Sequence, residues 1–357
     1  MKRFLILLML LCLCLPALAE DVKTSGNWEY IILEDNTAAL TRCIEHGLVV
    51  EFPSEIDGYT VSQIGRSSKD YGIDPAQLVG SAHMDIVFNL FNYYEAIQPV
   101  VEGAVKKLVI PESVKVLGTG VVAMSGESLS LDLPDHIEEI HSLAFYGCNI
   151  AEVRLPAGLK RLEAQPLHQC GGDLEALSLV KVKKKDVIQL PEHLEYLGPK
   201  ALGAMVSFPG SSNGKVSLTL PESLKTIDKY AFSGMYINEL TLPESMETIP
   251  AYTFNNCRYL KTISFPQGLK HIGQGAFTGC EISLEKVELP KGLLTIGAEA
   301  FLGCKKLKAV TIPASVTEIG DYAFEDCAEK ITFTVIKGSY GETWAKENDF
   351  KVKVKKK

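Results

Sequence analysis

The stretch FPQGLKHIGQGAFTGC (residues 265–280) returns as LPKGLLTIGAEAFLGC (289–304) and as IPASVTEIGDYAFEDC (312–327). Each copy opens with an apolar residue and a proline, continues with two aliphatic residues three positions apart, and closes with Ala-Phe and a cysteine. Immediately before the proline, apolar and polar residues alternate, as in Ile263-Ser264-Phe265. Alternation with a period of two is typical of a β-strand with one buried face.

The proline of this phrase recurs along most of the chain. Most steps between successive copies are 22 to 24 residues, and the steps after Pro156 and Pro191 are 35 and 30 residues, which indicates insertions. The series is Pro111, Pro134, Pro156, Pro191, Pro221, Pro243, Pro266, Pro290 and Pro313. A fixed period in this range predicts a leucine-rich-repeat solenoid.

One repeat can be interpreted physically. The proline lacks an N–H group and ends the strand, the two aliphatic residues turn inward, and the Ala-Phe segment crosses the far side as a short helical turn. A single repeat cannot bury its apolar residues alone, so neighbouring repeats must stack. We therefore expect an α/β solenoid with one long parallel β-sheet on its concave face and short helical turns on its convex face. A parallel β-helix is the alternative, but its coils would need more strand than this pattern offers.

Two positions of the repeat form columns. The aromatic column contains Phe145, Phe232, Phe254, Phe277, Phe301 and Phe324, with Leu167 and Leu202 in the irregular repeats. The sulfur column contains Cys148, Cys170, Cys257, Cys280, Cys304 and Cys327, with Met205 and Met235 in two repeats. Exchange with methionine indicates an apolar filler rather than a ligand. No C-x-x-C pair is present, so we expect mostly buried free thiols and no metal or other cofactor.

The first nineteen residues are typical of a secretory signal. Lys2 and Arg3 precede an apolar run, and Ala17-Leu18-Ala19 has the small-x-small pattern of a cleavage site. We expect cleavage after Ala19 and a secreted or cell-envelope protein without a transmembrane segment. Lipidation at Cys12 or Cys14 is the alternative, which the leucines before both cysteines disfavour.

The repeats resemble the BspA-like family of bacterial leucine-rich repeats. The resemblance extends to the stretch from Trp28 to Tyr30, to residues 53–61, and to the ending from Val335 to Asn348. It implies a secreted or surface protein of the adhesin type that acts on a host or matrix component. It implies no catalytic residues, because the shared motif of the family is core.

The pattern divides the chain into five parts. The leucine-rich repeats carry insertions near 180–188 and 206–216, and an irregular, partly helical segment lies before them. The parts are a signal peptide (1–19), an N-terminal cap with a degenerate first repeat (20–65), the irregular segment (66–108), the repeats (109–333) and a C-terminal cap (334–357). Within the last part we expect a short helix around Trp344 and then an edge strand.

Charge argues against one class of partner. The net charge is −8, and removal of Lys2 and Arg3 with the signal would take away two positive and no negative charges, giving −10. Nucleic acid requires a basic face, so we do not expect it as a partner.

Enzymatic chemistry has little support in the residues. No nucleophile elbow, phosphate loop or dinucleotide fingerprint is present. Cys43 and His46 lie three residues apart near the cap, so a hydrolase using this pair is a remote alternative. We expect that the protein is not an enzyme.

We expect instead a macromolecular partner, most simply a protein, with a glycan-binding protein or a purely structural envelope scaffold as alternatives. Solenoids present the outward side chains of their strands for binding. Here these are polar and lack an aromatic stripe, which disfavours sugar stacking. The first candidate surface contains Glu239, Thr241, Thr262, Ser264, Lys286 and Glu288. The second lies on the expected helix of residues 76–97 and contains Phe88, Phe91 and Tyr94, although this helix could instead pack against the first repeats.

Overall fold

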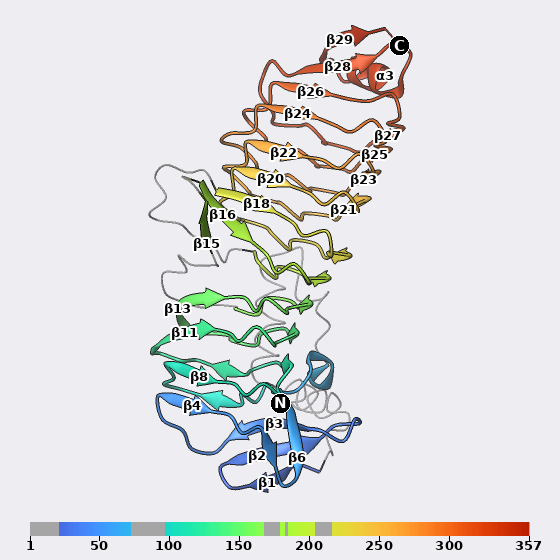
Figure 1. The fold of residues 1–357 in the computed structure, drawn as a ribbon. Helices are drawn as coiled ribbons and strands as arrows, with labels where there is room; N and C mark the ends of the chain where they lie inside the picture. Colours follow the sequence, from blue (N-terminus) through green and yellow to red (C-terminus); the bar gives the residue numbers. More distant parts are fainter. Residues whose placement is uncertain (1–20, 73–96, 168–178, 183–184, 204–215, 357) are drawn as a thin grey trace, which may run out of the picture.

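The computed structural model describes residues 21–72, 97–167, 179–182, 185–203 and 216–356. The repeats stack into one elongated solenoid (Figure 1). At one end β1 (Lys23–Ser25), β2 (Trp28–Ile32) and β3 (Ala38–Cys43) pair antiparallel and form the edge of a ten-stranded sheet. The other end carries α3 (Tyr340–Glu347) and β29 (Lys351–Lys355). The helix and edge strand expected near Trp344 are therefore present.

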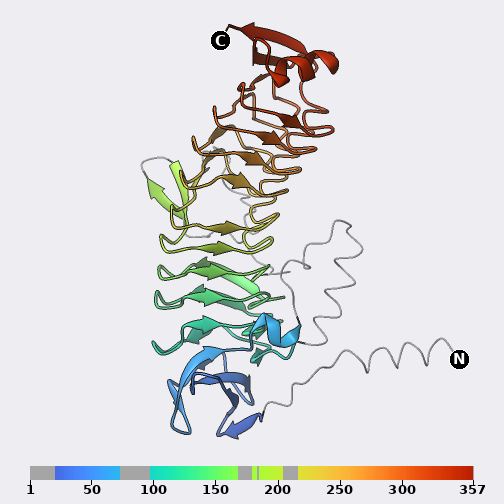
Figure 2. The same ribbon diagram turned by 90° about the vertical axis from the view of Figure 1, so that its right-hand side faces the viewer.

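The alternating segment before each proline is a strand, as the sequence predicts. Its central residue points inward, and Leu240, Val287 and Val310 are buried. These strands stack in parallel at successive levels (Figure 2). They are β4 (Val49–Glu51), β8 (Lys107–Val109), β11 (Ser128–Asp132), β13 (Asn149–Arg154), β16 (Lys185–Gln189), β18 (Val216–Thr219), β20 (Glu239–Thr241), β22 (Thr262–Ser264), β24 (Lys286–Glu288), β26 (Ala309–Thr311) and β28 (Thr332–Ile336). We call their outward surface the strand face.

The strand face is divided into three sheets, which corrects the expectation of one continuous sheet. The first break follows β13, where β15 (Leu179–Val182) runs antiparallel to β16 as part of the first insertion. The second break lies between β22 and β24. There the loop after Cys280 is one residue longer than the loops after Cys257 and Cys304, counted to the residue before the next proline. The break between β22 and β24 coincides with this extra residue.

A second face also consists of strands, so each coil contains more strand than the sequence pattern predicted. These short strands end on the second aliphatic residue of the phrase, for example Ile272 and Ile296, whose side chains are buried. They are β9 (Val116–Leu117), β12 (Glu139–Ile140), β14 (Arg161–Leu162), β17 (Tyr196–Leu197), β19 (Thr226–Ile227), β21 (Thr248–Ile249), β23 (His271–Ile272), β25 (Thr295–Ile296) and β27 (Glu318–Ile319). In this respect the coils approach the β-helix alternative. The longer β6 (Tyr59–Ile64) pairs with β9 at the start of this face.

The third face carries the Ala-Phe segment, and its described residues form turns rather than the expected helical turns. The N–H of Ala276 donates to the carbonyl of Gly273, three residues back, over 3.3 Å. The N–H of Phe277 instead donates to Ala300 of the next coil over 2.8 Å. The backbone at Gly275 is left-handed, with φ of 58°, which an α-helix does not tolerate. Bonds within a coil thus alternate with bonds between coils.

The aromatic column fills the centre of the solenoid, as predicted. Phe254, Phe277 and Phe301 are fully buried, and their rings stack in parallel with centroids 5.3 to 5.5 Å apart. Aromatic pairs at such distances add to the stabilisation that burial provides. At the C-terminal end, Trp344 packs against Phe324, the last ring of the column, with centroids 5.8 Å apart, and Phe350 packs against Trp344 at 5.4 Å.

The sulfur column lies next to the aromatic column. Among the described residues every cysteine is free, and all except the half-buried Cys327 are buried. The thiol of Cys304 donates to the carbonyl of Phe277 over 3.3 Å, and Cys257 bonds Phe232 in the same way over 3.4 Å. Burial raises the pKa of the Cys257 thiol to about 12. These thiols therefore pack and donate weakly, as the exchange with methionine suggested.

Candidate interaction surfaces

The first predicted surface lies on the strand face, where the six side chains belong to two sheets. Register pairs Glu239 with Thr262 and Thr241 with Ser264 across β20 and β22. Lys286 and Glu288 belong to β24, beyond the break. All six side chains point away from the core, and only Glu239 is partly covered.

Charges on the strand face are locally compensated. Lys286 and Glu288 form an ion pair along one strand. The hydrogen bond that Lys286 donates in this pair lowers the pKa of the Glu288 carboxyl. Ser217 Oγ donates to Glu239 over 3.0 Å. Exposed pairs of this kind contribute about 1 kcal/mol or less, so such contacts can be exchanged for others at small cost.

The second predicted surface lies outside the described residues, since Phe88, Phe91 and Tyr94 fall in the stretch 73–96. The chain is described again from Ile97, which is buried in a small apolar cluster with Leu143 and Tyr146. Tyr71, just before the undescribed stretch, packs against the same cluster. Both flanks of the segment therefore rest on the solenoid.

A third surface, which the sequence analysis missed, runs along a corner between the second and third faces. Tyr230 and Tyr252 stack with ring centroids 4.8 Å apart and planes 6° from parallel. Lys200 Nζ lies 5.8 Å from the centroid of Tyr230, and Tyr252 Oη donates to Glu299 over 3.4 Å. We call these four residues, Lys200, Tyr230, Tyr252 and Glu299, the tyrosine rim.

The tyrosine rim follows one position of the repeat, two residues before the aromatic column. The backbone at this position is left-handed in each coil, with φ of 63° at Tyr230, 56° at Tyr252 and 59° at Glu299. At Gly275 an added Cβ would lie 2.1 Å from Tyr252 Cε1, so only glycine leaves room for that ring. An alignment of the repeats at the position two residues before each aromatic residue would have revealed this column.

A buried carboxylate connects the irregular segment to the coils. Glu163 accepts hydrogen bonds from Ser68 Oγ over 2.6 Å and from the backbone of Ser142 over 3.1 Å, and Arg161 Nε donates to its other oxygen over 3.1 Å. Burial alone would raise the pKa of Glu163. The nearby His141 and these donors outweigh burial and lower it. The network holds residues 68–71 (η1) against the second face.

The two residues of the remote hydrolase alternative bond different backbone carbonyls. Cys43 Sγ donates to Glu45 O over 3.3 Å, and burial raises its pKa. His46 is half-buried, and its Nε2 lies 2.8 Å from Glu102 O. The thiol thus stays protonated and bonds a carbonyl rather than the imidazole. Among the described residues no group of three or more His, Cys, Asp or Glu could hold a metal ion.

No helix within the described ranges has both the length and the apolar character needed to cross a membrane.

Several solved structures are similar to this chain. A leucine-rich repeat protein from Bacteroides ovatus is 20% identical, with a TM-score of 0.39 over 93% of this chain and 99% of that one. A leucine rich cell surface protein from Faecalibacterium prausnitzii is 18% identical, with a TM-score of 0.38 over 93% and 97%. The pneumococcal vaccine antigen PcpA is 15% identical, with a TM-score of 0.39 over 95% and 99%. No curated protein sequence matches the chain significantly.

Family comparison agrees with the resemblance found in the repeats. The model of the BspA type leucine rich repeat region matches in six copies, over residues 102–203, 180–290 and 207–332. These matches cover more than half of the chain and coincide with the stacked coils. The chain belongs to the family of BspA type leucine-rich-repeat proteins.

Proposed function

We propose that this protein acts outside the cell or at its surface and binds a protein partner through the strand face. Proteins of this repeat family are generally surface proteins that act in protein interaction. The observation that carries the proposal is the arrangement of Glu239, Thr241, Thr262 and Ser264 on two hydrogen-bonded strands. Their side chains point outward and take no part in the core, so they can be used for binding.

Rigidity supports this assignment. The strands are held by parallel pairing on one side and by the fully buried aromatic column beneath them. A preorganised surface loses little conformational entropy on binding, which favours affinity. An adhesin-like contact with a host or matrix protein is the specific form that we propose.

A glycan-binding role is the second candidate, and the composition of the strand face disfavours it. The candidate strand-face residues include no aromatic side chain, and the faces of Tyr230 and Tyr252 cover one another. Sugar rings stack on open aromatic faces, and the two ring faces that meet in this pair are covered.

The test is a pull-down of the mature chain against matrix proteins, mucins and cell-wall glycans. Glu239→Lys with Glu288→Lys should abolish capture of a matrix protein and change the free energy of unfolding by about 0.5 kcal/mol or less. The matched control, Glu244→Lys with Glu318→Lys, makes the same change in charge at exposed positions away from the strand face. Capture that survives the strand-face variant, or capture of glycans alone, would contradict the proposal.

We also propose that secretion follows cleavage after Ala19. Residues 1–20 lie outside the described part of the chain, and the proposal rests on the charged, apolar and small-residue order of the signal. The mass of the secreted protein should correspond to a chain beginning at Glu20. A lipid-modified or uncleaved product would refute it.

A further inference from the structure

The third face carries a regular ladder of backbone hydrogen bonds along the axis of the solenoid. In the four coils that begin at Tyr230, Tyr252, Gly275 and Glu299, three N–H groups, two residues apart, donate to carbonyls of the following coil. Tyr252, Phe254 and Asn256 donate to Gln274, Ala276 and Thr278 over 2.7 to 2.9 Å. The same pattern follows from Gly275, Phe277 and Gly279 and from Glu299, Phe301 and Gly303, over 2.8 to 2.9 Å.

The ladder ends at the last coil. The equivalent donors there are the N–H groups of Tyr322, Phe324 and Asp326, and no described residue accepts a hydrogen bond from them. Phe324 is only 2% exposed, whereas Tyr322 is 64% exposed and Asp326 is exposed, so burial applies to the central donor alone. A buried N–H without an acceptor is rare in proteins, because its desolvation is not compensated. The C-terminal cap covers the ring of Phe324 with Trp344 but does not supply these carbonyls.

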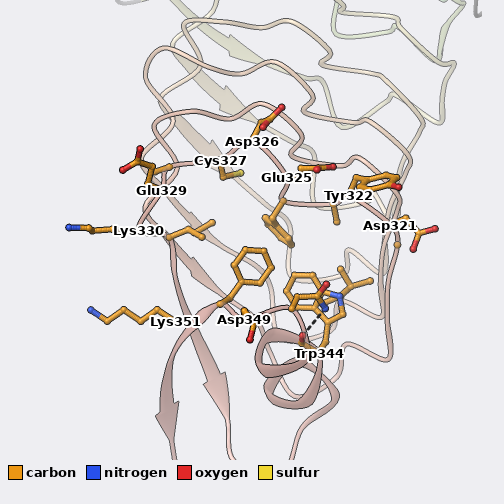
Figure 3. A pocket seen from close by; sticks show the side chains of 18 residues that line it. Asp321, Tyr322, Glu325, Asp326, Cys327, Glu329, Lys330, Trp344, Asp349 and Lys351 are labelled. Carbon is orange, nitrogen blue, oxygen red and sulfur yellow. Dashed lines mark hydrogen bonds between the residues drawn. The ribbon is translucent and has the colours of Figure 1, made fainter.

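A cavity of about 1090 Å³ lies at this position, between the last coil and the cap (Figure 3). Five carboxylates line it, and the two lysines that line it extend to one side, away from the aromatic rings (Figure 3). The carboxylates belong to Asp321, Glu325, Asp326, Glu329 and Asp349, and the lysines are Lys330 and Lys351. The lining therefore has a net charge of −3, which favours a cationic occupant.

Two requirements together define the occupant. The free N–H groups need acceptors spaced two residues apart, and the carboxylates repel anionic acceptors such as phosphate. Neutral amide carbonyls meet both conditions, and they are what the N–H groups of the four preceding coils bond in the coil that follows each of them. We propose that the cavity binds a basic polypeptide segment of a partner protein, whose backbone carbonyls accept hydrogen bonds from Tyr322, Phe324 and Asp326. Addition of a segment to an open backbone ladder is a known mode of peptide recognition.

The site is distinct from the strand face, so the two proposals can fail separately. The probe is the peptide acetyl-(Lys-Ala)₄-amide, added to the purified chain and followed by hydrogen–deuterium exchange. Exchange within residues 321–327 should slow by at least about tenfold, as expected for amides that gain a partner. The variant Asp321→Asn, Glu325→Gln and Asp326→Asn should abolish this effect. The control Glu222→Gln, Glu244→Gln and Glu247→Gln removes the same charge elsewhere and should retain it.

Every other result overturns the proposal. Protection that persists in the cavity variant would show that the carboxylates do not select the occupant. Equal protection by spermine, a cation without carbonyls, would reduce the effect to charge. Protection by chitohexaose but not by the peptide would identify a glycan site. If these amides already exchange slowly without any ligand, and sedimentation analysis shows dimers, the occupant is a second copy of the chain.

Discussion

Replacement of Phe277 by alanine tests the central feature of the core. Its ring is fully buried, stacks between Phe254 at 5.5 Å and Phe301 at 5.3 Å, and meets Phe265 edge-on at 6.0 Å. Core Phe→Ala changes cost about 3–5 kcal/mol, and the cost is greatest where the surroundings cannot close the cavity. The backbone ladder, including the 2.8 Å bond from Phe277 to Ala300, fixes the spacing of the coils. We therefore expect a loss of about 4–5 kcal/mol.

The assay is denaturant unfolding followed by tryptophan fluorescence. Trp28 in β2 and Trp344 in α3 lie at opposite ends of the solenoid, so single-tryptophan variants report each end separately. Because repeats are coupled to their neighbours, the loss should spread and separate the two transitions. Phe277→Leu is the control with a smaller loss, since Leu202 fills the same column and is fully buried. A Phe277→Ala protein that unfolds at the parent midpoint would refute the reasoning.

Three further predictions concern single side chains. Gly275→Ala should lower the Tm, because the added Cβ would lie 2.1 Å from Tyr252 Cε1 on a left-handed backbone; Tyr252→Ala should restore part of the loss, and a double variant no more stable than the single one would argue against this packing. Cys280 should react with a thiol reagent only after unfolding, because burial raises its pKa well above 9.0; rapid labelling of the native protein would contradict this. The lowered pKa of Glu163 means that its contribution to stability is complete above its ordinary value of 4.5 and is lost as the pH falls through the folded pKa. Glu163→Gln should therefore flatten the acid side of the stability profile, and an unchanged profile would be inconsistent with the network at Ser142.

The sequence by itself determined the repeat, its period and the residues of the core. In a stacked solenoid, each buried side chain contacts the same position of the adjacent coils. Register alone therefore predicts that Phe254, Phe277 and Phe301 meet, and that Cys257 and Cys280 pack rather than bind metal. The resemblance to the BspA-like family followed from the same positions, and the family model confirms it.

The tertiary structure decided how the backbone closes each coil. Whether an Ala-Phe segment forms a helical turn or a ladder depends on hydrogen bonds to the next coil, such as Phe277 to Ala300, which no single repeat encodes. The break between β22 and β24 likewise depends on the pairing of neighbouring strands. Local pattern cannot predict these features, because their energies come from neighbours in space.

The surfaces show the same division. The outward position of Glu239 and Thr241 follows from alternation along a strand and was predicted. The tyrosine rim required the left-handed backbone at Tyr230 and Tyr252, which turns these side chains along the corner of the solenoid. The free amides near Phe324 exist only because the stack ends there and the cap covers its ring but not its backbone. An end of this kind is a property of the assembled coils, and it cannot be predicted from the residues of a single repeat.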